Sequence, residues 1–573
     1  MQLVTLAALA ASASLVIAAP GKGQLCRNLP SDRNWPRIPD WNALNRTVGG
    51  RLIRGAPVAV SCYGPGANNT ICSNLKANWG IPDPFVDQPV SVVSPYFSND
   101  TCSPFVGSET ASDISNCQLG NLASYAIEVV DAKTAAAGIK FARERNIRLV
   151  VKNTGHDYLG GSAGKGALAL WTHHLNDISL VQYKSQYYSG PAFRIGAGVQ
   201  FHDLYTVAMS KGLRVVGGSC PTVGAAGGWR QGGGHGPLAS MYGLGADNAL
   251  EFEVVTTDGR HITASSKQNS DLFWALSGGG AGNYAVVISV VIRAHQDGQV
   301  AGSRLTINNN GDAVYWTAVK EWVKHLLFLD GIKGFATDVL LTKDSFSLAA
   351  ATLPGGNESD MIQALAPFYS SLAKLNITPV VNETKVQSTY LEHYQEYIGG
   401  NVFTRNITIG DRLIPRSLVR NGKELDKLIA TFRELVAAPD MQLFLLGYNV
   451  KLERSGIPEG FNAITPAWRD SLFSVNIIVD GGLNDSWEKM EDDLARVNGW
   501  QDRLRKLTPK GGAYINEGTY NAVQWKDDYF RGTYNRLRAI KEKYDPGFVL
   551  YTRPGVGSDE YVERPDGHLC KVY

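Results

Sequence analysis

The stretch from Gly217 to Gly236 reads GGSCPTVGAAGGWRQGGGHG, and nine of its twenty residues are Gly. Glycine tolerates positive φ angles and lets backbone N–H groups approach a ligand without an intervening Cβ. Successive N–H groups in such a loop form an anion-binding concavity, which suits a pyrophosphate. The stretch lacks both GxxxxGK[ST] and a strand–GxGxxG–helix unit, so it predicts neither a P-loop nor a Rossmann site. On composition alone, a flexible surface loop is the alternative.

A second Gly-rich loop lies upstream. It reads KNTGHDYLGGSAG from Lys152, follows the predicted strand RLVVKN, and contains His156. A single histidine in a loop is more often structural than functional. Two Gly-rich loops after strands, one with His156 and the other with Cys220, favour a ligand site.

Several segments of this chain resemble those of a known family, from about residue 119 to 561. The two loops resemble the flavoprotein oxidases of the vanillyl-alcohol-oxidase type (PCMH-type), in their berberine-bridge-enzyme-like branch, closest to secreted fungal isoamyl-alcohol-oxidase-like members. Three further segments match: YGLGADN at 242–248, LFWALSGGGAGNY at 272–284, and the helix-and-stop segment from Arg536 to Pro546.

The resemblance implies FAD held by two covalent bonds, from His156 to the flavin 8α carbon and from Cys220 to flavin C6. The other residues it places at the cofactor are Lys152, Asn153, Thr154, Gly155, Gly218, Gly224, Gly228 and Asn516. Many relatives carry Gly in place of Thr154, which we expect to leave the bond chemistry intact. Because the thiolate is the nucleophile, we expect backbone N–H groups of the loop to lower the pKa of Cys220. No metal site is expected.

Oxidation of an alcohol also needs a base for the hydroxyl proton. The family commonly has Tyr-x-Asn-Tyr near the C-terminus, and its second Tyr is the base in carbohydrate oxidases; here the segment is Tyr514-Ile515-Asn516-Glu517. Glu517 in place of Tyr puts carbohydrate specificity in doubt, and a surface salt bridge is the alternative role. In a strand, Tyr514 and Glu517 face opposite sides, so they share a site only if the segment bends.

Other polar and aromatic residues have weaker claims. Asp480, at the end of the predicted strand LFSVNIIVD, is a second candidate base, and Tyr448 and Asn449 are candidate pocket residues. We assign structural roles to the remaining candidates: the pair His173 and His174, and the helically spaced core aromatics Trp316, Trp322 and Phe328.

The order of elements predicts an α+β fold. From Tyr125 a strand, a helix capped by Asp131 and further strands alternate. With the resemblance, this indicates a PCMH-type FAD-binding domain of two subdomains at 119–295. Long strands at 296–505 predict a substrate domain with an antiparallel sheet backed by helices. Residues 506–573 form the berberine-bridge-like segment that returns to the FAD domain.

The N-terminal part indicates secretion. Residues 1–19 resemble a signal peptide, and 20–118 form a Cys-rich extension. In an oxidising compartment six of the seven cysteines can pair in fifteen ways; we expect Cys62–Cys72, Cys102–Cys117 and Cys26–Cys570, which leaves Cys220 outside the framework. Eight sequons predict N-glycans on several of Asn45, Asn68, Asn99, Asn357, Asn376, Asn382, Asn406 and Asn484.

The net charge of +2 gives no electrostatic reason to expect nucleic acid or an anionic membrane as partner. We expect a monomeric extracellular FAD oxidase that moves hydride from an alcohol or sugar-like substrate to the flavin and is reoxidised by O2 to give H2O2. The alternatives are a dehydrogenase that excludes O2, an oxidase of amines or alkaloid-like molecules, a polyketide or alkaloid tailoring enzyme, and a catalytically inert binding glycoprotein.

Overall fold

A computed structural model of the chain describes residues 26–98, 101–105, 117–400 and 405–572. The predicted signal peptide and the sequon at Asn99 lie outside the described residues. The N-terminal extension carries short helices: α1 (Ile38–Thr47), α2 (Asn69–Asn78), α3 (Asp83–Val86) and α4 (Pro95–Ser98).

The first sheet has the order β1-β2-β4-β3 and opens the predicted FAD-binding region. Its strands are β1 (Leu52–Arg54), β2 (Tyr125–Glu128), β3 (Leu149–Lys152) and β4 (Leu168–Trp171), the last three parallel. Helix α5 (Ala132–Glu144) packs on it, and the side chain of Asp131 accepts a hydrogen bond from the Thr134 amide. The predicted cap at Asp131 is therefore confirmed.

The second sheet is antiparallel and has the order β5-β6-β10-β8-β9. Its strands are β5 (Ile178–Lys184), β6 (Ser189–Gly196), β8 (Ala249–Val255), β9 (His261–Ser265) and β10 (Val286–Arg293). The helices α6 (Phe201–Ser210) and α9 (Ser270–Leu276) pack against it in one hydrophobic cluster. The 217–236 loop, with the single-turn helix α7 (Gly228–Gln231), belongs to this half.

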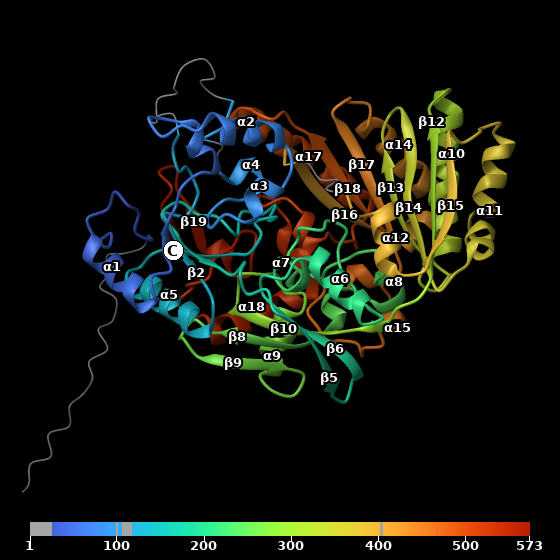
Figure 1. Cartoon of the computed structure of the whole chain (residues 1–573). Helices are drawn as coiled ribbons and strands as arrows, with labels where there is room; N and C mark the ends of the chain where they lie inside the picture. The colour runs from blue at the N-terminus through green and yellow to red at the C-terminus, as the bar shows by residue number, and fades with distance from the viewer. Residues whose placement is uncertain (1–25, 99–100, 106–116, 401–404, 573) are drawn as a thin grey trace, which may run out of the picture.

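A seven-stranded antiparallel sheet makes up most of the other half, in the order β15-β12-β14-β13-β17-β18-β16 (Figure 1). Its strands are β12 (Val300–Asn308), β13 (Ala336–Leu341), β14 (Ser345–Pro354), β15 (Val381–Gln387), β16 (Ile407–Pro415), β17 (Met441–Tyr448) and β18 (Ser471–Asp480). The helices that pack on one face of it are α10 (Asp312–Leu329), α11 (Glu358–Lys374), α14 (Gly422–Leu435) and α17 (Trp487–Leu507). The predicted α+β fold with a helix-backed antiparallel sheet is confirmed.

One prediction about this core is wrong. Trp316 and Trp322 are buried between α10 and the sheet, but Phe328 is 53% exposed. Phe328 lies in the last turn of α10, where it stacks on His325 at the helix surface.

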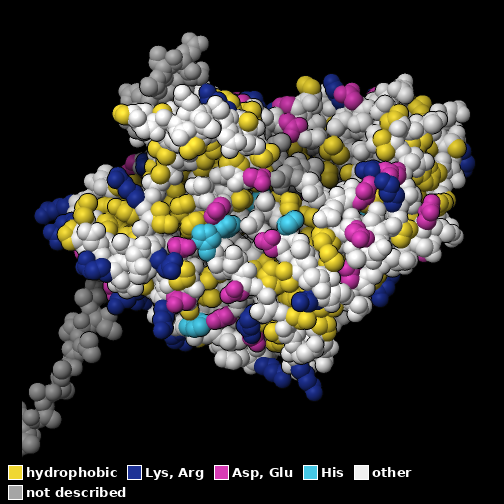
Figure 2. Space-filling view, in the orientation of Figure 1, with side chains coloured by type: hydrophobic (Ala, Val, Ile, Leu, Met, Phe, Trp, Pro, Cys, Tyr) yellow, Lys and Arg dark blue, Asp and Glu magenta, His cyan; other side chains and the backbone are white. Residues whose placement is uncertain are grey.

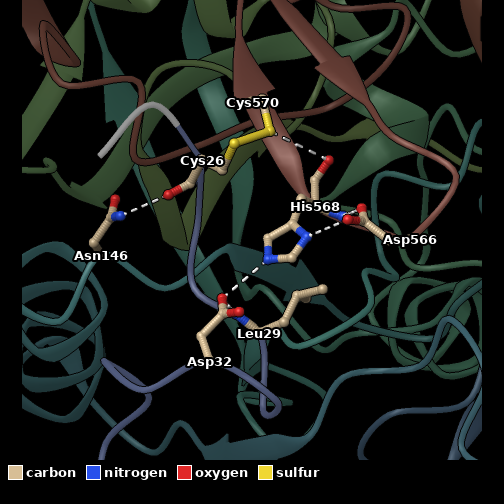
Figure 3. The surroundings of a disulfide bond; sticks show 7 residues. All are labelled: Cys26, Leu29, Asp32, Asn146, Asp566, His568 and Cys570. Carbon is tan, nitrogen blue, oxygen red and sulfur yellow. Dashed lines mark hydrogen bonds and ion pairs between the residues drawn. A yellow bond between two sulfur atoms is a disulfide. The ribbon is translucent and has the colours of Figure 1, made fainter. Parts of the chain in front are cut away.

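A disulfide joins the first and last described segments, and the C-terminal segment also pairs with the first sheet. Helix α18 (Tyr534–Tyr544) packs on α9, and Leu550 pairs with Leu149 of β3. Figure 3 shows Cys26 bonded to Cys570, with the amide of Asn146 donating to the Cys26 carbonyl at 2.8 Å. All three expected disulfides are present. No helix among the described residues combines the length and hydropathy needed to cross a membrane.

The predicted glycosylation sites differ in exposure. Five of the seven sequons in the described residues are exposed, at Asn68, Asn357, Asn376, Asn382 and Asn484. Asn45 is half-buried, and Asn406 is only 8% exposed.

Candidate active site

A cavity of about 510 Å³ lies between the two Gly-rich loops and the seven-stranded sheet. Alternate residues of four strands line it, because side chains at i and i+2 share a sheet face. These are Asp338 and Leu340 of β13, Ile407 and Ile409 of β16, Gln442, Phe444 and Leu446 of β17, and Asn476, Ile478 and Asp480 of β18. The volume is within the usual range of about 300–1,000 Å³ for small-molecule and cofactor sites.

The first Gly-rich loop contributes Asn153, Thr154, Gly155 and His156 to the cavity wall. Gly155 has φ of +82°, and a Cβ there would come within 2.9 Å of the Ser91 carbonyl oxygen. Lys152 differs from these neighbours, because it does not line the cavity. Its buried ammonium donates to the carbonyls of Phe85, Val86 and Gln88 in the N-terminal extension.

The second loop is packed against the first. A Cβ on Gly224 would come within 2.1 Å of the Asn153 side-chain nitrogen, so the two loops meet without space for a larger residue. The Asn516 side chain donates to the carbonyls of Gly228 and Trp229, at 3.0 and 3.2 Å. Gly228 lines the cavity, and a Cβ on it would meet no protein atom within 4 Å. The backbone here is open to a ligand, as a bound FAD requires.

His156 and Cys220, from different loops, both contact the hydroxyl of Thr222. The Thr222 oxygen lies 2.8 Å from Nε2 of His156 and 3.6 Å from the Cys220 sulfur. Burial, with the charge of Lys152, lowers the pKa of His156 to about 4, so its imidazole is neutral above that pH. Burial raises the pKa of Cys220. The loop N–H groups of Thr222 and Val223 do act to lower this pKa, as expected, but desolvation outweighs them and the net shift is upward.

Glu517 is part of a buried polar network. Residues Ile515–Glu517 form a 3₁₀ turn and not a strand, so the segment bends and Tyr514 and Glu517 both line the cavity. Nε2 of His235 donates to Oε1 of Glu517 at 2.9 Å, and the Asn476 amide donates to Oε2 at 2.9 Å. Burial lowers the pKa of His235, but the Glu517 carboxylate outweighs it and the net shift is upward.

Two further carboxyl groups lie near this pair. Burial raises the pKa of Asp411 to about 7, and its oxygens accept hydrogen bonds from the Ser474 hydroxyl and the Tyr514 amide. Burial likewise raises the pKa of Asp338 to about 6, and the hydroxyl of Tyr448 donates to it. Both carboxyls bind protons more readily than an exposed Asp does.

Three other candidate residues, Tyr514, Asp480 and Asn449, differ in their position relative to this network. Burial raises the pKa of Tyr514 well above its usual value, so its hydroxyl stays protonated. Asp480 is exposed, and both its oxygens accept from the Gln442 amide. It lies four residues beyond Asn476 on β18, roughly 13 Å along the strand. The Asn449 side chain donates to the Asp330 carbonyl and does not line the cavity.

The sequence reasoning missed His235, Asp338, Asp411, Asn476 and Thr222. Asp338 and Asp411 had a signal, since each is a carboxylate inside an apolar strand, where a charge needs a partner or a function. His235 had only its place in the Gly-rich loop.

Comparisons with known proteins agree with this geometry. A family model described as an FAD binding domain matches residues 123–265, and one described as berberine and berberine like matches 513–557. The VAO-type flavoprotein oxidase VAO615 of Thermothelomyces thermophilus is 40% identical, over 96% of this chain and 95% of that protein. This chain belongs to the VAO-type flavoprotein oxidases, in their berberine-bridge-like branch. It is an FAD-linked oxidoreductase.

Other members of the family extend the comparison. The bifunctional decalin synthase calF of Penicillium decumbens is 37% identical, over 97% of each chain. The crystal structure of the VAO-type flavoprotein MtVAO615 from Myceliophthora thermophila C1 superposes with a TM-score of 0.90 at 39% identity, covering 96% of this chain and 100% of that one. In the present chain, the residues matched by the FAD-binding family model include both His156 and Cys220.

Proposed function

We propose that this protein is a secreted oxidase that takes a hydride and a proton from an apolar alcohol, with Glu517 as the base. When bound, FAD accepts the hydride and passes the electrons on to O2, which becomes hydrogen peroxide. The alcohol becomes a carbonyl compound, so its hydroxyl proton needs an acceptor on the protein.

The Glu517–His235 pair is the observation that carries this proposal. Two donors, His235 and Asn476, orient the Glu517 carboxylate at the cavity wall. Each carboxylate oxygen has two acceptor sites, so one stays available for a substrate hydroxyl. Tyr514 remains protonated and therefore supplies a hydrogen-bond donor rather than the base.

His156 and Cys220 are proposed to attach the cofactor covalently. If Nε2–H of His156 donates to Thr222, the lone pair of Nδ1 is available as the nucleophile. The Cys220 thiol contacts the same hydroxyl and must lose its proton before it can form a bond. Thr222 is placed to hold both groups at the cavity wall.

The apolar sheet face favours an apolar substrate over a sugar. Its strands present Leu340, Ile407, Ile409, Phe444 and Ile478 to the cavity. A buried sugar leaves hydroxyls without partners against such a surface, at a cost of about 1–3 kcal/mol each. Oxidation of an apolar secondary metabolite is a second candidate that the same surface favours, and the relative named decalin synthase supports it.

Secretion is proposed from the apolar segment at 1–19, the three disulfides and the five exposed sequons. Asn406 is proposed to stay unmodified in the folded protein because its side chain is buried. Mass spectrometry of peptides from the secreted protein tests both the cleavage near residue 19 and the glycan positions.

A substrate panel tests the proposed activity. We expect medium-chain and aromatic primary alcohols to bleach the flavin absorption anaerobically, and to release hydrogen peroxide in air, faster than glucose or cellobiose. Faster bleaching by the sugars would contradict the apolar-alcohol proposal. Bleaching without peroxide in air would make the protein a dehydrogenase.

A further inference from the structure

Three potential metal ligands, none of which lines the cavity, meet near the surface. Oδ1 of Asp87 lies 3.7 Å from Nε2 of His173 and 3.3 Å from Nε2 of His174. One ligand atom from each of the three residues lies within 4.8 Å of the others. Figure 2 shows histidine and acidic side chains gathered at one place on this face of the molecule. The three residues come from two distant parts of the chain.

Hydrogen bonding fixes the orientation of one of these histidines. Nδ1 of His174 lies 2.8 Å from Oε1 of Glu128, which is bonded in turn to Arg51 through Oε2 at 2.9 Å. A carboxylate only accepts hydrogen bonds, so Nδ1 of His174 carries the proton. Nε2 is therefore the His174 nitrogen that faces a carboxylate oxygen of Asp87, 3.3 Å away.

We propose that Asp87, His173 and His174 bind one zinc ion, with water in the fourth position. Bonds of about 2.0–2.1 Å in a tetrahedral site place ligand atoms roughly 3.3 Å apart, close to the separations found here. The carboxylate of Glu128 behind His174 is the partner that metal-bound histidines usually have. Nitrogen ligands favour zinc over magnesium or calcium.

The site joins the N-terminal extension to the FAD-binding region. Asp87 follows α3, whereas Glu128 ends β2 and the two histidines follow β4. Lys152 holds the loop that carries Asp87, through its bonds to the carbonyls of Phe85, Val86 and Gln88. Because this loop is already fixed, a metal ion needs little rearrangement to bind. Zinc therefore stabilises the contact between the extension and the first sheet.

Zinc titration of the flavin-loaded full-length protein tests the proposal. After dialysis against a chelator, calorimetric titration with zinc chloride should show one ion per chain and a higher Tm for the zinc form. Asp87→Asn and His174→Gln should each weaken zinc binding by at least about tenfold. Asp87 is exposed, so its variant should fold, and an unchanged flavin spectrum checks this.

The matched control is His261→Ala, which removes an exposed histidine that pairs with a single carboxylate, Glu253. It should bind zinc as the wild type does, and magnesium should produce no heat in any of these proteins. Absence of stoichiometric zinc binding in the wild type, or equal zinc affinity in the wild type and the Asp87→Asn variant, would overturn the proposal. In that case the three residues contact one another without a metal ion.

Discussion

Nε2 of His235 lies 2.9 Å from Oε1 of Glu517, although 282 residues separate the two in the chain. The bond joins the second Gly-rich loop to the C-terminal segment. The side-chain amide of Asn476, on β18 of the seven-stranded sheet, donates to the same carboxylate. One carboxylate thus connects the three parts of the molecule that enclose the cavity. A group fixed from three directions is well placed to take a proton in a defined geometry.

Replacing the two proposed attachment residues should release the flavin in steps. His156→Ala and Cys220→Ala should each keep one covalent bond, and the double variant should keep none. Intact-mass spectrometry of acid-precipitated protein measures this directly. A colourless pellet from the wild type would contradict covalent attachment, and His202→Ala, an exposed histidine elsewhere, serves as the control.

Thr222→Val should reduce the covalently bound flavin fraction, because it removes the hydroxyl that contacts both His156 and Cys220. Thr222→Ser keeps the hydroxyl and should retain most of the attachment. Peptide mass spectrometry, with separate quantitation of the two linkages, distinguishes the variants. Equal attachment in the Val and Ser variants would show that the hydroxyl has no part in it.

The contribution of Asp411 to stability should fall as the pH rises from about 4 to 7. The folded protein raises the pKa of Asp411 to about 7, whereas an unfolded Asp titrates near 3.9, so the folded state binds the extra proton in this window. The full effect is about 4 kcal/mol, as an upper bound. Asp411→Asn should therefore make the difference in Tm between pH 7.5 and pH 4.5 more positive than in the wild type.

The control for this experiment is Asp492→Asn, an exposed carboxylate on α17. It should follow the wild-type dependence of Tm on pH. A difference in Tm between pH 7.5 and pH 4.5 that is the same in Asp411→Asn as in the wild type would contradict the assignment.

The Cys26–Cys570 disulfide should stabilise the protein more than the local ones do. It closes a loop with a sequence separation of 544, against 10 for Cys62–Cys72. In the chain-entropy model, the stabilisation that a disulfide provides grows with the length of the loop that it closes. Replacing both Cys26 and Cys570 by Ser should cost about 2–5 kcal/mol and lower the Tm. A larger loss of Tm from the Cys62–Cys72 double variant would contradict this.

Local signals in the sequence were sufficient for much of the fold. The Asp131 side chain and the apolar periodicity after it predicted α5, and the Cys spacing within the extension favoured two short disulfide loops. The Gly-rich loops could be placed at a ligand because two of them follow strands, one with His156 and the other with Cys220. The predicted cofactor residues of the two loops line the cavity, apart from Lys152, whose side chain points to the extension.

Long-range partners were not predictable from the sequence. The bend after Tyr514 depends on contacts such as the Asp411 bond to the Tyr514 amide, and β16, which carries Asp411, had not been recognised as a strand. Which face of β17 and β18 reaches the cavity depends on strand register, and a shift of one residue reverses it. Likewise, Asp87 is brought to His173 and His174 only by the folded extension.

The most direct test of Glu517 as the base is the anaerobic rate of flavin reduction, measured by stopped flow with the best alcohol from the panel. Glu517→Gln keeps the size of the side chain and should slow reduction by about 10²-fold or more, with unchanged covalent flavin. Asp480→Asn, at the cavity edge, should stay within about threefold of the wild type. A Glu517→Gln rate equal to the wild type, or a larger loss in Asp480→Asn, would contradict the account.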